Sequence, residues 1–340
     1  MTLAEVVLAV MWVGLTAYAV LGGADFGAGF WDLFAGSATR GARQRDLIAA
    51  VIGPVWEVNH VWIIFCLVVL WTAFSAAFGA IMSTLYIPLT LVTFGIILRG
   101  SGFAFRKVAT TVELRRIWGA TFAMSSVVTP FFLGAVAGGV ASGRVPLGDD
   151  AGDALTSWLN PTSVLGGLLA VGTCAFLAAT FLTREAHHRG EEALAAGFRL
   201  RAIGAGFATG AVALVGIFVL RADAPELFDG LTGRALPVVV VSGLAGSGAI
   251  VLLWKRRYVV ARLAAATAVA AVLWGWAVGQ YPHVLEPDVE IADVAAPRAT
   301  LEALLVVLVV GAVFLIPSLL WLYRLTEQGT LGETGPEPQT

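Results

Sequence analysis

Long apolar runs alternate with short polar segments along the whole chain, and nine of these runs are about 20 residues long or longer. A helix of about 20 apolar residues crosses the roughly 30 Å of hydrocarbon in a bilayer. The runs are too long for barrel strands and lack period-two alternation, so each is expected to be helical. The pattern predicts an all-α polytopic membrane protein with nine transmembrane helices at residues 3–23, 47–75, 80–99, 118–140, 162–183, 202–220, 235–254, 262–280 and 301–323.

The order of the runs suggests how the helices are grouped. We expect two four-helix bundles plus one peripheral helix within a single membrane domain, residues 1–326. The short uncharged gap between the second and third runs predicts a tight hairpin. The first run has no basic segment before it and no cleavage site, so it is interpreted as a retained helix. Residues 327–340 are rich in Gly, Glu and Pro and are expected to form a disordered cytoplasmic tail.

Basic residues are concentrated on one side of the predicted membrane domain. Of the 21 lysines and arginines, 17 fall in the loops after the first, third, fifth and seventh helices or directly after the ninth. Cytoplasmic loops carry an excess of Lys and Arg, so this side is expected to be cytoplasmic. The sequence therefore predicts an N-terminus outside and a C-terminus inside the cytoplasm.

Composition excludes a water-soluble domain. The chain is 58% hydrophobic and 13% charged, and its mean hydropathy is +0.85. A soluble protein of 340 residues needs more polar surface than this. The sequence contains no Walker A motif, no GxGxxG and no spacing typical of a catalytic triad. Both cysteines, Cys66 and Cys174, lie inside apolar runs, where they are expected to act as small buried hydrophobes.

A few polar residues stand inside or beside the predicted helices, where a charge is costly. They are Asp25 at the end of the first helix, Trp56, Glu57, Asn59 and His60 in the second, and Arg99 at the end of the third. Glu57 follows Leu47 by ten residues, or about 15 Å of helix, which predicts a depth near the middle of the bilayer. Pro54 predicts a kink just before this cluster.

Two interpretations of this polar cluster remain open. Glu57, Asn59 and His60 could hold a buried proton or cation, or Glu57 could pair with a basic residue and only lock the helices together. Asp25 and Arg99 are expected near the cytoplasmic edge, where Arg99 either reaches the interface or pairs with Glu57 or Asp25. The glycines at 23 and 27 predict close approach of a second helix.

The histidines argue against a haem in this chain. Of His60, His187, His188 and His283, only His60 lies within a predicted helix. Membrane b-type haems are usually held by a His with a second His or Met, so one such residue does not fit several haems. We therefore predict no cofactor and no metal bound by this chain.

Three segments resemble subunit II of the cytochrome bd-type quinol oxidases, including the cyanide-insensitive branch. The most specific is Ile52-Gly53-Pro54-Val55-Trp56-Glu57-Val58-Asn59-His60-Val61-Trp62. The second is Gly23-Ala24-Asp25-Phe26-Gly27-Ala28-Gly29. The third is Gly279-Gln280-Tyr281-Pro282 followed by Pro287-Asp288 and Ala295-Ala296-Pro297. The resemblance covers essentially the whole chain, including its length and its nine helices.

The resemblance implies a haem-free subunit of a respiratory quinol:dioxygen oxidoreductase in the bacterial inner membrane. The partner, subunit I, would carry two b-type haems plus haem d, or a third b haem, together with the quinol site. A small single-helix subunit, lipids and quinone are further expected partners, and nucleic acid is not. The complex would take protons from the cytoplasm without pumping, with Glu57 as a relay and Asp25, Trp56 and Arg99 near it.

One position departs from the family. In Gly102-Phe103-Ala104-Phe105-Arg106 the family's acid is replaced by Ala104, so proton uptake at that point must use another group or water. Two other classes of protein also remain open. A secondary transporter would use Glu57 and His60 as a coupling site, and a structural subunit would use the cluster only as a lock.

Overall fold

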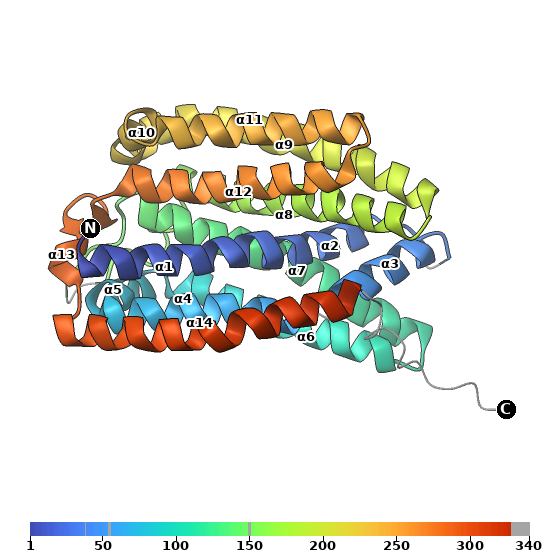
Figure 1. The fold of residues 1–340 in the computed structure, drawn as a ribbon, viewed down its shortest axis with the longest axis horizontal. Coiled ribbons are helices and arrows are strands. Elements are labelled where there is room, and N and C mark those ends of the chain that lie inside the picture. The colour runs from blue at the N-terminus through green and yellow to red at the C-terminus, as the bar shows by residue number, and fades with distance from the viewer. Residues whose placement is uncertain (38, 54–55, 149–150, 328–340) are drawn as a thin grey trace.

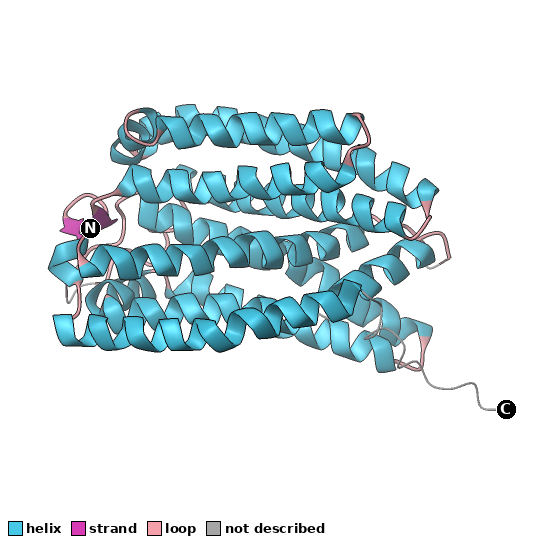
Figure 2. Cartoon of the chain, viewed as in Figure 1, coloured by secondary structure: helices cyan, strands magenta, loops and turns pink. Residues whose placement is uncertain are grey.

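Long helices lie side by side along the longest axis of the computed structural model, which describes residues 1–37, 39–53, 56–148 and 151–327 (Figure 1). Within these residues, nine helices are long and apolar enough to cross a membrane. The remaining described elements are short helices and one two-stranded sheet, so the secondary structure is almost entirely helical (Figure 2). The predicted all-α membrane fold is confirmed.

The elements follow one another in a simple order. The helices are α1 (Leu3–Ala17), the π-helical turn η1 (Tyr18–Gly22), α2 (Gly23–Leu33), α3 (Ala42–Ile52), α4 (Trp56–Ala73), α5 (Ser75–Thr84), α6 (Tyr86–Val108), α7 (Val112–Ala141), α8 (Pro161–His188), α9 (Glu192–Asp223), α10 (Pro225–Thr232), α11 (Leu236–Trp254), α12 (Tyr258–Gln280), α13 (Ile291–Val294) and α14 (Arg298–Glu327). Strands β1 (His283–Leu285) and β2 (Val289–Glu290) pair antiparallel between α12 and α13.

The spanning helices form two groups of four. The first bundle contains α1–α2, α4, α6 and α7, and the second contains α8, α9, α11 and α12. The groups meet where α8 packs against α2 and α7. Helix α14 packs mainly on the outside of α1 and α4 and exposes most of its surface (Figure 1). The predicted two bundles and peripheral helix are confirmed.

The two ends of the molecule differ in charge. The end that carries α3 and the α6–α7, α8–α9 and α11–α12 connections is rich in Lys and Arg, and we call it the basic end. The other end carries Met1, α5, α10, the sheet and α13, and we call it the acidic end (Figure 1). Helices α1 and α6 both run from the acidic end to the basic end, so they are parallel.

The first membrane helix is longer than predicted and contains one irregular turn. It continues through η1 and α2 to Leu33, ten residues beyond the predicted end at residue 23. The length of an apolar run predicts only the part of a helix that lies in hydrocarbon. A helix that is buried among its neighbours can continue past a charged residue. Asp25, predicted at the membrane edge, consequently lies inside a continuing helix and is buried.

The predicted helix 47–75 is wrong as a single element. Helix α3 ends at Ile52 and α4 begins at Trp56, and a further short helix, α5, occupies most of the gap that was predicted to be a tight hairpin. Hydropathy does not distinguish one spanning helix from two consecutive helices when both are apolar. The kink predicted at Pro54 and the tail predicted at 328–340 lie outside the described residues.

Small residues bring α2 against the second bundle. A Cβ atom added at Gly27 would overlap the Cys174 carbonyl of α8, and one at Gly29 would overlap the Ser126 side chain of α7. At Gly23 the nearest atoms are side-chain atoms of Leu177 and Cys174. The predicted close approach of a second helix is confirmed at Gly27, where the partner is α8, whereas Gly23 makes only ordinary side-chain contacts with the same helix.

Candidate functional site

A buried ion pair joins α2 to α6. Arg99 Nη2 lies 2.7 Å from Asp25 Oδ1 and also donates to the Asp25 carbonyl oxygen at 3.2 Å. The Arg99 residue is 1% exposed and Asp25 is 4% exposed. Arg99 is thus paired with Asp25 rather than with Glu57, and it does not reach the surface, because α6 continues to Val108 beyond it.

The guanidinium group of Arg99 is surrounded by side chains of α2 and α7 in the first bundle. Its Nε donates to Ser126 Oγ on α7 at 3.1 Å. Its carbon Cζ lies 4.8 Å from the centre of the Phe26 ring and 5.1 Å from that of Phe122. A buried charge is tolerated when it is paired, hydrogen-bonded and placed over aromatic faces. Arg99 therefore fixes α2, α6 and α7 in one register.

A second pair repeats the first one two helical turns nearer the basic end. Asp32 on α2 forms two ion pairs. Its Oδ2 accepts a hydrogen bond from Arg106 of α6, and its Oδ1 accepts one from Arg45 of α3 at 2.9 Å. Asp25 and Asp32 are seven residues apart, and so are Arg99 and Arg106. Residues seven apart share a helix face, so two parallel helices can form two such pairs. This matched spacing is visible in the sequence and is the signal by which Asp32 and Arg106, which were not predicted, could have been found.

A polar group surrounds the π-helical turn η1. The Asn59 side chain donates from Nδ2 to the Leu21 carbonyl of this turn at 3.4 Å. The His60 ring lies 6.2 Å from the Tyr18 ring and 5.9 Å from the Phe26 ring, centre to centre. The Asn59 amide thus ties α4 to η1, and His60 lies beside Tyr18. π-Helical turns often occur at functional sites. Tyr18 was not predicted, because a tyrosine within an apolar run has the pattern of a core residue.

Glu57 lies outside the core of this chain. It lies in the first turn of α4 and is exposed on the surface of this chain. The predicted depth assumed an unbroken helix from Leu47, and the break between α3 and α4 removes that assumption. A carboxylate in a first turn is favoured by the helix dipole. Trp56 beside it is half-buried, with its ring 5.6 Å from that of Phe103 on α6.

The exposed face of α4 that begins at Glu57 is otherwise apolar. Four large side chains follow Glu57 at heptad spacing on this face, each 43–64% exposed: Val61, Ile64, Val68 and Trp71. We call this row the α4 stripe. Spacing of four and three residues is the pattern by which one helix packs along another. Ala104, which replaces the family's acid, is also exposed, on α6.

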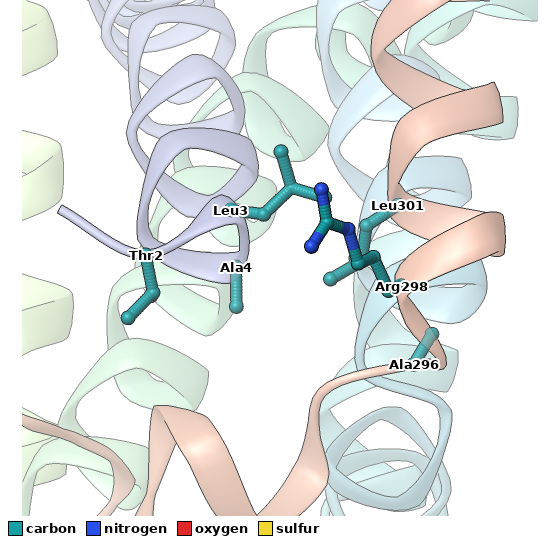
Figure 3. A pocket seen from close by; sticks show the side chains of 6 residues that line it. All are labelled: Thr2, Leu3, Ala4, Ala296, Arg298 and Leu301. Carbon is teal, nitrogen blue, oxygen red and sulfur yellow. The ribbon is translucent and has the colours of Figure 1, made fainter.

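A separate pocket opens at the acidic end between the starts of α1 and α14. Its volume is about 490 Å³, and Figure 3 shows the Arg298 side chain pointing across it toward Leu3. Arg298 Nε donates to Glu302 at 2.7 Å. The other lining residues are Thr2, Ala4, Ala296 and Leu301. The lining residues thus offer one hydroxyl, apolar walls and one guanidinium that is already paired with Glu302, and none of them is a carboxylate or a histidine.

Two carboxyl groups in the acidic-end loops have shifted pKa values. Burial raises the pKa of Glu286, and the nearby His283, whose Nδ1 lies 3.3 Å away, partly opposes the shift. Hydrogen bonds from the Thr156 and Leu155 N–H groups and the Thr156 hydroxyl lower the pKa of Asp153. Neither group lies near the Asp25–Arg99 pair in the fold, so both belong to loop structure.

The chain resembles one protein family along almost its whole length. The family described as "Cytochrome bd terminal oxidase subunit II" matches residues 3–326. Among curated proteins, cytochrome bd ubiquinol oxidase subunit 2 of Bacillus subtilis is 27% identical over 180 residues, which cover 52% of this chain and 51% of that protein. Cytochrome bd-I ubiquinol oxidase subunit 2 of Escherichia coli K12 is 29% identical over 174 residues, covering 49% and 45%. These alignments span about half the length of either relative.

A solved structure matches the whole fold. A chain in the structure of bd oxidase from Geobacillus thermodenitrificans superposes with a TM-score of 0.74 and 29% sequence identity. The match covers 96% of this chain and 98% of that chain. Both the order of the helices and their arrangement are therefore shared.

Proposed function

The chain belongs to the cytochrome bd terminal oxidase subunit II family, and from this premise we propose that it is the haem-free subunit of a quinol:dioxygen oxidoreductase. In this proposal it binds and stabilises a haem-bearing subunit I in the bacterial inner membrane, with its N-terminus outside and its C-terminus inside. The complex oxidises quinol, reduces dioxygen to water and takes up protons from the cytoplasm without pumping. The chain contributes part of the proton path.

The observation that carries this proposal is the exposed carboxylate of Glu57 at the head of the α4 stripe. A charge facing lipid costs several kcal/mol on most scales, and a stripe at heptad spacing suits a helix of another subunit. A partner covering this face would exclude lipid from Glu57. The carboxylate would then lie between two subunits rather than inside one.

A carboxyl group at such an interface can relay protons. Proton transfer by a positioned side chain needs a donor and an acceptor within hydrogen-bond reach, and a carboxyl group offers both as it gains and loses a proton. Glu57 lies toward the basic end of the bundle, which we assign to the cytoplasm, so the path would run from that side to the redox centres of the partner.

We assign the haems to subunit I because the side chains of this chain do not suit a haem. Of the histidines in the described spanning helices, His187 and His188 lie in the last turn of α8 at the basic end, and the His60 ring is flanked by the rings of Tyr18 and Phe26. A low-spin b haem needs a second axial ligand opposite the first. In the described residues no group of three His, Cys, Asp or Glu is placed to hold a metal ion. When bound in the partner, the two b-type haems and haem d, or a third b haem, would supply the electron transfer.

The Glu57→Gln variant tests the relay. Gln keeps the size and polarity of the side chain but cannot exchange a proton, so turnover should fall by at least about tenfold while the haem spectrum of the purified complex persists. The matched control is Glu302→Gln, which removes another exposed carboxylate from a membrane helix, α14. Equal turnover of wild type and Glu57→Gln would remove the relay role.

Subunit binding is tested separately. Trp71→Ala and Val68→Ala together should weaken co-purification of the haem-bearing chain, because they shorten the apolar stripe without touching a charge. Purification of a stable, active chain without any haem-bearing partner would contradict the proposal as a whole. Such a result would favour a transporter, for which His60 and Glu57 remain a candidate coupling site.

A further inference from the structure

Unpaired buried polar atoms are concentrated around the π-helical turn. Nine buried side-chain nitrogen and oxygen atoms in the described residues have no hydrogen-bond partner within the chain, and five of them belong to four neighbouring residues. These are Tyr18 Oη, Asp25 Oδ2, Asn59 Oδ1, and both ring nitrogens of His60. Their residues come from only two segments, α1–η1–α2 and α4.

Contacts bring Tyr18, Asn59 and His60 together between the two segments, and Asp25 follows Tyr18 by seven residues along the same membrane helix, about two turns away. Tyr18 and His60 have their ring centres 6.2 Å apart, and Asn59 is held to the Leu21 carbonyl of the same turn. Phe26, which follows Asp25, closes the group with its ring 5.9 Å from His60 and 6.4 Å from Tyr18. Cys174 on α8 packs against Tyr18 and Phe26 from the other side.

Five unpaired polar atoms in one buried place would be strongly destabilising. Buried polar groups in proteins are nearly always hydrogen-bonded, and where protein partners are lacking an ordered water with about three hydrogen bonds usually supplies them. The set of atoms suits water well. Asp25 Oδ2 and Asn59 Oδ1 accept, Tyr18 Oη donates and accepts, and a neutral His60 donates through one nitrogen and accepts through the other.

A metal cation fits this place less well than water. The Asp25 carboxylate is already neutralised by Arg99, whose guanidinium lies 2.7 Å from Oδ1. A second cation would face that positive charge in a poorly solvated interior, where repulsion is strong. The Cys174 thiol, which packs against Tyr18 and Phe26, is neutral in its usual form, as is the Tyr18 hydroxyl itself.

We propose that Tyr18, Asn59, His60 and the free oxygen of Asp25 form a buried water-binding site, and that this water conducts protons alongside the path through Glu57. The proton-conducting role rests on the proposed function, whereas the water-binding site does not. The bound water accepts a proton on one side and releases another of its protons on the other side. No residue therefore needs a net change of charge. Tyr18 and His60 are positioning residues that hold the water.

The Tyr18→Phe variant of the intact complex tests the water site through the sign of a thermal shift. If Tyr18 Oη binds an ordered water, its removal breaks hydrogen bonds, and the Tm should fall by about 2 °C. If Tyr18 Oη has no partner at all, its removal deletes an unsatisfied polar atom, and the Tm should rise or stay unchanged, which would overturn the proposal. Tyr86→Phe, on the exposed surface of α6, is the control and should leave the Tm unchanged.

Two substitutions of His60 test the proton-conducting role. His60→Gln retains a donor and an acceptor and should keep more than half of wild-type turnover, whereas His60→Leu removes both and should lower it about tenfold with a larger solvent isotope effect. Equal turnover and equal isotope effects in the two variants would overturn this role. The Tm measurement does not depend on turnover. A normal Glu57→Gln enzyme combined with a lowered Tm in Tyr18→Phe would therefore refute the path through Glu57 and keep the water site.

Discussion

The two bundles have the same number of helices but different interiors. In the first bundle, the polar bonds of the core cross between helices, as in the pair of Asp25 with Arg99 and the bond from Arg99 to Ser126. In the second bundle, the core is built from alanines and larger apolar residues. The hydroxyls in the middle of α8, Thr180 and Thr183, bond the carbonyls of Phe176 and Ala179 in their own helix. The bond from the Thr162 hydroxyl to Asp223 does cross between helices, but it lies at the acidic end.

This difference separates two ways of holding membrane helices together. Alanine and glycine allow close approach, and many such contacts tolerate small changes of register. A buried charge has one acceptable partner, so a crossing ion pair fixes the register but is costly when one partner is lost. The first bundle therefore combines specificity with polar chemistry, and the second bundle acts as an apolar support for it.

The largest effect is expected from breaking the buried ion pair on one side. Arg99→Met leaves the Asp25 carboxylate unpaired in the core and should cost about 3–5 kcal/mol, so that little complex accumulates. The double variant with Asp25→Leu removes both charges and should recover most of the yield. In the second bundle, Thr183→Val should cost less than about 1 kcal/mol, because the lost bond lies within one helix.

Yield and thermal unfolding of the purified complex measure these three variants. A single Arg99→Met variant as stable as the double variant would contradict the role of the ion pair in the first bundle.

A smaller effect is expected where the bundles touch. Gly27→Ala places a methyl group against the Cys174 carbonyl of α8 and should cost about 1–3 kcal/mol, because backbone must move. Gly210→Ala on α9 in the second bundle meets no atom within 4 Å and should be neutral or stabilising by up to about 1 kcal/mol. Thermal unfolding of the two variants measures the difference. Similar Tm values would show that α2 and α8 do not pack tightly.

The second ion pair should respond to salt in a way that the first does not. The side chains of Arg45 and Arg106 are 23% and 24% exposed, whereas that of Arg99 is 1% exposed. Asp32→Asn should therefore cost about 1–2 kcal/mol at low ionic strength and less near 1 M salt, where the Debye length is about 3 Å. Thermal unfolding across a salt series checks this. A cost that does not change with salt would show that Asp32 is as shielded as Asp25.

The smallest effect is expected in the loop that joins the bundles. The hydrogen bonds from Thr156 and Leu155 lower the pKa of Asp153 in the folded protein below its usual value of 3.8. A carboxyl with a lowered pKa stabilises the fold above its unfolded pKa and loses that contribution as pH falls through the folded value. Asp153→Asn should thus reduce stability slightly at neutral pH and not at all once the pH lies below the folded pKa of Asp153.

The pH dependence of Tm for wild type and Asp153→Asn measures this effect. Two parallel curves would show that Asp153 makes no pH-dependent contribution to the loop.

Part of the candidate site was predictable from sequence, and part was not. Asp25, Asn59, His60 and Arg99 were identified because polar residues inside apolar runs are rare enough to need a reason. The depth of Glu57 stays a prediction, and the count behind it was wrong, because it followed a helix that is in fact two helices. Tyr18 was missed for the opposite reason, since its apolar neighbours gave no sign that its hydroxyl group lies beside His60.

The sequence by itself determined the number of spanning helices, because hydrocarbon thickness sets the length of every apolar run and backbone groups in lipid must bond within a helix. The tertiary structure decided which charges meet. Asp25 and Arg99 are 74 residues apart, and their pairing depends on two parallel helices lying in one register, which no local pattern specifies. It also decided that Glu57 faces outward, because exposure follows from the packing of all the helices together.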